Sequence, residues 1–243
     1  MNNNTPASSF SKEKNGIKAM FDAIAPRYDL LNHILSLGID QGWRKFLTHR
    51  LTQMQPSKVI DVATGTADLA LMIAKNTEAS VTGADISPGM IAIGHKKVAR
   101  AGLSRRITLI EGDSARLPFA DGAFDAATVA FGVRNFEDTV QGLTGINRIL
   151  RPGGRISVLE FSSPRGVMGT LARFYMRRIM PLAGGIISGH PSAYTYLPET
   201  ALAFPEGEAF ASLLREAGFD AVTITPLTFG IATLYEGQKP PVK

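Results

Sequence analysis

The apolar residues near the start of the chain recur at helical spacing. Between Ile17 and Ile24 they follow the i, i+3, i+4, i+7 rule, which predicts an amphipathic helix. Pro26 is expected to interrupt this helix, because an interior proline lacks the backbone N–H that the helix needs. Further apolar faces between residues 30 and 47 predict more helices. We therefore expect an N-terminal helical cap over residues 1–55.

After this cap, apolar strand-like segments alternate with amphipathic helices. Single intervening helices, such as the one that Ser87 is expected to cap and Pro88 to begin, are typical of crossovers between parallel strands. Residues 151–154, with two glycines and a proline, predict a turn. The expected strands are 58–63, 80–84, 106–111, 124–130 and 155–161, followed by a hairpin of 221–226 and 228–234.

This order predicts an α/β fold with a doubly wound, mostly parallel seven-stranded sheet over residues 56–243. The alternation breaks at about 162–205, which we interpret as a lid-like insertion. Within it, a basic amphipathic stretch from Arg165 to Arg178 mixes arginines with aromatic and aliphatic side chains. That mixture suits an interface better than a phosphate-binding groove.

The composition of the chain limits the kinds of catalytic group that it can use. The chain has no cysteine, which excludes thiolate catalysis, and its four histidines, at 33, 49, 95 and 190, show no paired metal-binding spacing, so we expect no metal. The net charge of +5 is compatible with nucleic acid, an anionic membrane or an anionic substrate. With no apolar run of about 20 residues and no signal peptide, a cytoplasmic location is expected.

Polar residues follow each of the first three expected strands, where doubly wound sheets bind their ligands. After the first strand, Gly65 allows a tight turn and Thr66 is expected to cap the next helix. Asp85 lies 20 residues after Gly65, where a carboxylate can accept hydrogen bonds from both ribose hydroxyls. After the third strand, Asp113 and Ser114 lie where an adenine amino group is expected. The predicted adenosine-binding residues are Asp61, Gly65, Thr66, Asp85, Asp113 and Ser114.

Other interpretations are weaker. A lone aspartate after a strand is more often a turn residue, but three such turns would rarely fall at these offsets. Tyr235 and Lys239 have the spacing of a dehydrogenase pair, yet they are expected after the last strand, and the dinucleotide glycines are missing. A nucleic-acid methyltransferase lacks support because no Pro-Pro-aromatic motif follows the fourth strand, so no nucleic-acid partner is expected.

Several motifs resemble known families. The loop at 61–68, Gly83-Ala84-Asp85, residues 112–119 and Leu150–Gly154 resemble class I methyltransferases. The segments Phe21–Asp29, continuing to Arg44, and Phe131–Asn135 resemble the two signatures of the ubiquinone/menaquinone biosynthesis C-methyltransferase family, and the resemblance covers nearly all of the chain after about residue 16. The chain departs from the usual pattern at Thr64, Ala67 and Ala130, where relatives often have glycine, glycine and serine.

This resemblance implies S-adenosyl-L-methionine as cofactor and a prenylated quinol as methyl acceptor: demethylmenaquinol, the benzoquinol of the ubiquinone pathway, or both. Another small aromatic acceptor and a non-catalytic adenosine-binding scaffold are the alternatives. Because a prenylated quinol resides in the bilayer, we expect the basic stretch at 165–178 to contact an anionic membrane surface peripherally.

The quinol's phenol should have a pKa of about 10, so its reactive phenolate needs a stabilising cation or hydrogen-bond donor. Arg134 is the expected cation, Asn135 the expected positioning donor, and Tyr28 is expected to close the pocket. The plainer alternatives are a surface salt bridge for Arg134 and a wedge between helices and core for Tyr28.

Overall fold

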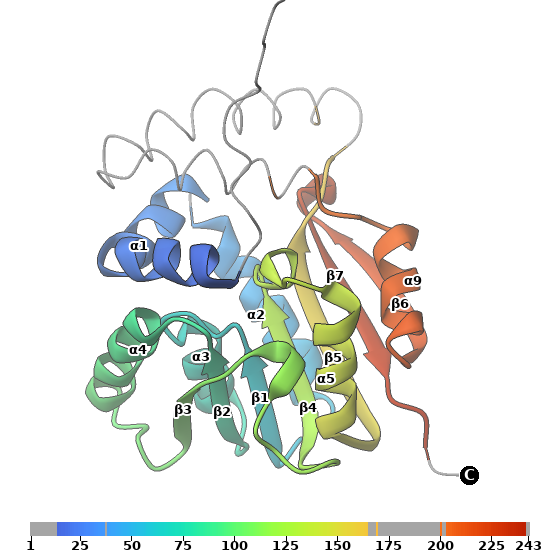
Figure 1. Ribbon diagram of the computed structural model, residues 1–243, viewed down its shortest axis with the longest axis horizontal. Helices are drawn as coiled ribbons and strands as arrows, with labels where there is room; N and C mark the ends of the chain where they lie inside the picture. The colour runs from blue at the N-terminus through green and yellow to red at the C-terminus, as the bar shows by residue number, and fades with distance from the viewer. Residues whose placement is uncertain (1–13, 37, 165–168, 170–199, 201–202, 242–243) are drawn as a thin grey trace, which may run out of the picture.

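A computed structural model describes residues 14–36, 38–164, 169, 200 and 203–241, except for some side chains of the first helix. Within this part, a seven-stranded sheet has the order β3-β2-β1-β4-β5-β7-β6 (Figure 1). The first five strands pair in parallel, and β7 is antiparallel to β5 and β6. The strands are β1 Lys58–Val62, β2 Ser80–Asp85, β3 Ile107–Glu111, β4 Phe124–Ala130, β5 Leu150–Phe161, β6 Asp220–Leu227 and β7 Ala232–Gln238. The expected doubly wound sheet is confirmed.

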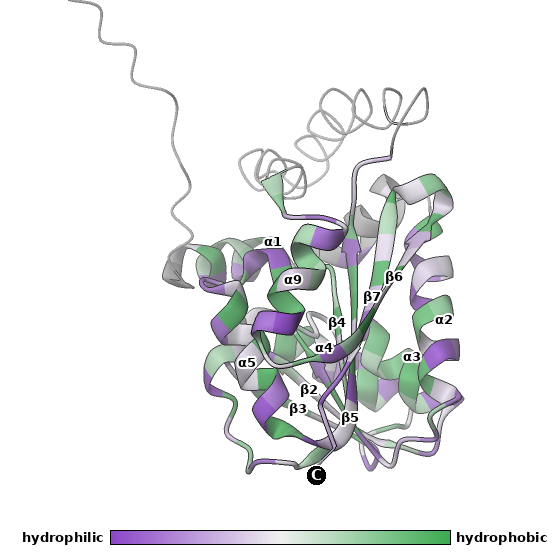
Figure 2. Ribbon diagram, turned by 90° about the vertical axis from the view of Figure 1, so that its right-hand side faces the viewer, coloured by the Kyte–Doolittle hydropathy of each residue, from purple (hydrophilic) through white to green (hydrophobic). Residues whose placement is uncertain are grey.

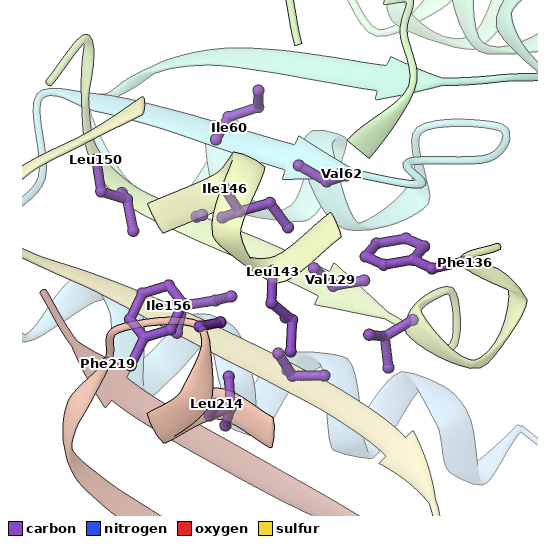
Figure 3. Close-up of a cluster of buried hydrophobic side chains, with 14 of the residues drawn as sticks. Ile60, Val62, Val129, Phe136, Leu143, Ile146, Leu150, Ile156, Leu214 and Phe219 are labelled. Atoms are coloured by element: carbon purple, nitrogen blue, oxygen red, sulfur yellow. The ribbon is translucent and has the colours of Figure 1, made fainter. Parts of the chain in front are cut away.

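Helices cover both faces of the sheet because its central strands are apolar on both sides. Figure 2 shows α2 Ile39–Thr52 and α3 Asp68–Asn76 on one side, and α5 Thr139–Ile149 and α9 Glu208–Glu216 on the other. The apolar side chains of α2, α3 and α4 (Pro88–Arg100) share one core cluster with the sheet, and those of α5 and α9 share a second. Figure 3 shows Leu143 and Ile146 of α5 packed over β1, β4 and β5.

The first helix, α1 Lys14–Leu35, continues through Pro26, so the expected interruption there is wrong. Contacts on both sides of the proline explain why. Asp22 accepts hydrogen bonds from Ser87 and Gly89, and Asp29 binds Lys97. Tertiary contacts of this kind stabilise most protein helices and outweigh one missing backbone bond.

Helix α2 packs directly on the sheet, although it lies within the expected cap. Trp43, Leu47 and Leu51 are buried in its core. The Trp43 Nε1 donates to Thr228 Oγ1 at 2.8 Å, next to β7. The boundary at residue 55 stays a prediction, but α2 is integrated with the sheet.

Three local expectations need adjustment. The turn at 151–154 is an irregularity inside β5, where the pairing with β4 shifts register and Gly153 has a φ of 77°. The closing hairpin is confirmed, but its second strand begins at Ala232 because the short 3-10 helix η4 Thr228–Gly230 forms the connection. Tyr235 therefore lies inside β7 and not after the last strand, and it is almost fully buried.

The helix starts behave largely as expected. Ser87 caps α4, since its Oγ accepts from the Met90 N–H at 3.1 Å, and Pro88 begins the helix. The proposed insertion at about 162–205 and its basic stretch lie almost wholly outside the described residues. Among the helices that the structure describes, none combines the length and apolarity needed to cross a bilayer.

Candidate functional site

A cleft opens at the carboxyl ends of β1 and β4, where the strand order of the sheet reverses. Doubly wound sheets bind ligands at this kind of position. About 760 Å³ of empty space in the cleft is continuous with open solvent. Its lining includes Gly65, Asp85, Asp113, Ser114 and Asn135, together with Ile17, Phe21, Val62, Ala63, Ile86, Met90, Gly112, Ala130, Phe131, Gly132, Phe136 and Glu137.

The loop after β1 has an unusual backbone. Ala63, Gly65 and Ala67 have φ values of 54°, 56° and 69°. Only glycine adopts this left-handed region freely, so the two alanines store strain, which is often concentrated at functional sites. Ala67, one of the positions that departs from glycine, is the N-terminal residue flanking α3 and makes no side-chain cap.

Thr66 is therefore not the helix cap that the sequence suggested. Its Oγ1 donates to Asp29 Oδ1 at 2.5 Å and accepts from Lys97 Nζ at 3.0 Å. It is buried and does not line the cleft.

Asp85, the last residue of β2, lines the cleft. Its Oδ2 accepts from the Gly65 N–H at 2.8 Å, and its Oδ1 accepts from the Ser87 N–H at 2.9 Å. Burial raises the pKa of Asp85, whereas hydrogen bonds from the backbone of Ser87, Gly65 and Ile86 act in the opposite direction.

Asp113 and Ser114 line the same cleft from the end of β3. Asp113 flanks the 3-10 helix η1 Ser114–Arg116, where its Oδ1 accepts from the Ala115 N–H at 3.1 Å. Ser114 is 8% exposed and lies under α5. The structure thus brings together four of the six predicted adenosine-binding residues: Gly65, Asp85, Asp113 and Ser114.

Asp61 lies beneath the loop and not on the cleft wall. Its two oxygens accept from Thr64 Oγ1 at 2.7 Å and Thr128 Oγ1 at 2.6 Å. Burial raises the pKa of Asp61 to about 6, although both threonine hydroxyls favour its charged form. Asp61 therefore joins the loop to β4 in place of the ligand contact that the sequence suggested.

The other side of the cleft follows β4. Phe131 has a φ of 58° and packs against Trp43 and Phe161, with ring centroids 6.0 and 4.6 Å away. At Gly132, a Cβ would lie 2.5 Å from the Cβ of Ala63, so glycine lets the two strand-end loops meet. Asn135 ends the 3-10 helix η2 Val133–Asn135, and its buried Oδ1 has no hydrogen-bond partner among the described residues.

Arg134 does not line the cleft and faces away from it toward β5. Its Nη1 donates to Glu160 Oε1 at 2.6 Å and to the Phe131 carbonyl at 2.7 Å. Arg134 is 4% exposed and Glu160 is fully buried. Both the expected contact with the acceptor and the alternative of a surface salt bridge are therefore absent from this conformation. The pair is a buried ion pair behind the cleft wall.

The sequence pattern missed the wall that α1 supplies. Ile17 and Phe21 line the cleft, although their periodicity was interpreted only as a helix face. Periodicity identifies a buried face but not its neighbour. Tyr28 lies in α1, but its side chain is outside the described part of the structure.

Neither the histidines nor a metal-binding cluster can be assigned to the cleft from the described residues. His49 and His95 are exposed, while His190 and the His33 side chain are outside the described part. Over the residues that can be described, no group of three His, Asp or Glu side chains is placed to hold a metal ion.

Known proteins show which family the chain resembles. A model of the ubiE/COQ5 methyltransferase family matches residues 9–239. The chain is 47% identical to a demethylmenaquinone methyltransferase of Thermus thermophilus over 223 residues, 91% of this chain and 100% of the relative. It is also 47% identical to a ubiquinone/menaquinone biosynthesis C-methyltransferase, UbiE, of a Geobacter species, over 94% of this chain and 98% of the relative.

Solved structures share the fold at low identity. The [4+2]-cyclase SpnF matches with a TM-score of 0.65 and 18% identity, over 98% of each chain. Phosphoethanolamine N-methyltransferase 2 of Haemonchus contortus, in complex with S-adenosyl-L-methionine, matches with a TM-score of 0.57 and 16% identity, over 76% of this chain and 49% of that one. These likenesses confirm the expected fold class. Since a cyclase shares it, the fold alone does not assign the reaction.

Proposed function

The chain belongs to the ubiE/COQ5 methyltransferase family, and from this premise we propose that it transfers a methyl group from S-adenosyl-L-methionine to a ring carbon of a prenylated quinol. The printed names of the relatives support the acceptor class. The observation that carries the proposal is the cleft in which Asp85, Asp113 and Asn135 converge at the strand-order reversal.

The cofactor fits the residues present. In this proposal Asp85, held by the Gly65 and Ser87 amides, accepts hydrogen bonds from the ribose hydroxyls, and Asp113 accepts from the adenine amino group. Ile17, Phe21 and Phe136 supply apolar parts of the cleft wall. S-adenosyl-L-methionine supplies an already activated methyl group, so the chain's own task is to orient the acceptor and raise its nucleophilicity.

Asn135 is the residue of the cleft best suited to meet the acceptor. Its Oδ1 is buried and without a partner in the described structure, a state that costs about 1–3 kcal/mol unless a ligand donor fills it. A quinol hydroxyl is such a donor. Asn135 would then act as an acceptor and not as the donor expected from the sequence, and it would hold the hydroxyl in one orientation and thereby fix the reacting carbon beside it.

Arg134 acts through Asn135 in this proposal. Its bond to the Phe131 carbonyl and its ion pair with Glu160 hold η2, and hence Asn135, against the cleft. Asn135→Ala should lower kcat with little change in cofactor affinity. Arg134→Lys should do the same more weakly, because lysine keeps the charge but not the forked geometry. Unchanged turnover in Asn135→Ala would remove this residue from the mechanism.

Demethylmenaquinol is our first choice of acceptor. The test incubates the purified protein with the cofactor and, separately, with a prenylated naphthoquinol, a prenylated benzoquinol and an unprenylated quinol. We expect a mass gain of one methylene on the naphthoquinol. Gain on the benzoquinol alone would reverse the choice, and gain on neither prenylated quinol would reject quinol methylation.

We further propose that the protein works at the inner face of the membrane, where its prenylated acceptor resides. The support is the sequence of the basic stretch, in which arginines alternate with apolar residues, and the net charge of +5. Substitution of Arg173, Arg177 and Arg178 by Glu should abolish co-sedimentation with anionic vesicles while leaving binding of the cofactor unchanged. Equal sedimentation of the variant and the unaltered protein would contradict this location.

A further inference from the structure

Helix α1 is tied to the nucleoside-binding elements by two aspartates seven residues apart, and therefore on one helical face. Asp22 Oδ1 accepts from Ser87 Oγ at 2.5 Å and from the Gly89 N–H at 2.9 Å, at the start of α4. Asp29 Oδ1 accepts from Thr66 Oγ1 at 2.5 Å, in the loop after β1. Figure 1 shows α1 lying above α3 and α4.

Lys97 of α4 completes the second of these ties. Its ammonium donates to Asp29 Oδ2 at 2.8 Å, to Thr66 Oγ1 at 3.0 Å and to a carboxylate oxygen of Asp68 at the start of α3. Lysine has three N–H donors, so this geometry provides a partner for each of them. One ammonium thus joins α1, the loop after β1, α3 and α4, and only 23% of its side chain is exposed.

The position of α1 determines whether the cleft is closed on one side. Ile17 and Phe21 form part of its wall, and both lie on the same helix as Asp22 and Asp29. Because Ile17 and Phe21 line the cleft together with Asp85, displacement of α1 would widen it. The bonds of Asp22 and Asp29 oppose that movement.

We propose that Lys97 is a positioning residue that latches α1 over the cofactor cleft, so that cofactor exchange requires the bonds between Asp29, Lys97 and Asp68 to break. The proposal rests on the assigned cofactor but not on the identity of the acceptor. Without the ammonium, Asp29 and Asp68 would face each other as like charges, which favours displacement of α1.

The first test measures the rate at which S-adenosylhomocysteine leaves the protein, without any acceptor. Lys97→Gln should increase this dissociation rate about five- to tenfold, the usual lower range for coupling between elements. Lys96→Gln is the matched control, because Lys96 is exposed on the same helix and should leave the rate unchanged. Raised salt should speed release from the unaltered protein but not from Lys97→Gln, since ions screen the latch.

The second test follows α1 directly and does not depend on a ligand. Because the chain has no cysteine, spin labels can be placed at Ala23→Cys and Lys96→Cys, both of which are exposed. We expect one narrow distance distribution with Lys97 present and a broader, longer one in the Lys97→Gln background. If that variant does not fold, Asp29→Asn removes the α1 half of the latch while leaving Lys97 paired with Asp68.

The outcomes separate the two proposals. Failure of the unaltered protein to bind S-adenosylhomocysteine would reject the assigned cofactor, and the spin-label distances would still report on the latch. Binding with equal release rates and equal distance distributions in the unaltered protein and Lys97→Gln would overturn the latch while leaving the methyltransferase function intact.

Discussion

Single carboxylates at the cleft are held by the backbone before any ligand arrives. Both oxygens of Asp85 accept backbone amide hydrogens, so its orientation does not depend on a bound ribose. This preorganisation lowers the entropy that binding must overcome.

Asp85→Asn should therefore weaken S-adenosylhomocysteine binding about 10- to 100-fold, because the asparagine amide turns a donor toward the Gly65 or Ser87 N–H. Isothermal titration calorimetry measures the effect. Asp121→Asn is the control, since Asp121 is an exposed partner of Arg148 far from the cleft and should bind normally. Equal affinities in the two variants would remove Asp85 from the binding site.

Asp61 makes stability depend on pH in an uncommon direction. Burial raises the pKa of this carboxyl from 3.8 to about 6, while Arg44 opposes the rise and Asp85 adds to it. The folded chain therefore binds a proton more tightly than the unfolded chain does. The stability linked to Asp61 is present below about pH 4 and is lost as the pH rises through 6.

Compared with Asp61→Asn, which stays neutral, the unaltered protein should lose on the order of 2 kcal/mol of unfolding free energy between about pH 4.5 and 7.5. Urea unfolding of both proteins at both pH values measures this difference. If the unfolding free energies of the two proteins differ by the same amount at both pH values, Asp61 is charged over this whole pH range and the prediction is wrong.

At the scale of elements, α5 approaches the site more closely than an ordinary helix would. A Cβ at Gly145 would overlap the carbonyl oxygen of Ser114, and one at Gly142 would overlap the ring of Phe136. These two glycines let α5 press η1 against the cleft. The separation of α5 and η1 is therefore part of how Ser114 is placed.

Gly145→Ala should destabilise the protein by about 1–3 kcal/mol and weaken cofactor binding, since overpacking must move η1. Helix propensity alone predicts the opposite sign. Gly42→Ala is the matched control: a Cβ there meets nothing within 4 Å, so it should stabilise α2 by about 0.5–1 kcal/mol. Urea unfolding measures the stability of both variants, and calorimetry measures their cofactor binding. Stabilisation by Gly145→Ala would refute the close packing.

At the scale of the whole molecule, the cleft draws on one half of the fold. It is lined from α1, from Met90 of α4 and from the ends of β1, β2, β3 and β4 with the segments that follow them, whereas α9, β6 and β7 contribute nothing among the described residues. The two halves share the sheet but not the site.

Saturating S-adenosylhomocysteine should accordingly stabilise the protein unevenly. At about 100 times its Kd the ligand adds about 2.7 kcal/mol, which should raise the Tm by about 5–10 °C. Hydrogen exchange should slow most in α1 and in the loops after β1 to β4, and least in α9 and β6. Uniform protection, or protection confined to β6 and β7, would contradict the assigned cleft.

The sequence by itself determined the order of strands and helices, the start of α4 and the group Gly65, Asp85, Asp113 and Ser114. These features are local or periodic: a cap residue bonds within its own turn, and the carboxyl ends of parallel strands necessarily meet at one edge. The family motifs also identified the chain's relatives.

Only the tertiary structure decided the roles of Thr66, Asp61 and Arg134. Thr66 and Arg134 looked like ligand contacts because they follow expected strands, and Asp61 because it lies near the end of one. Thr66 bonds instead to Asp29, Asp61 to Thr128 and Arg134 to Glu160, and each partner is distant in sequence. The tertiary structure also decided the course of α1, which continues through Pro26 and lines the cleft because its aspartates bond to distant parts of the chain. Partners that are distant in sequence cannot be predicted from periodicity, because the energy of a buried polar group depends on which side chains the whole fold brings to it.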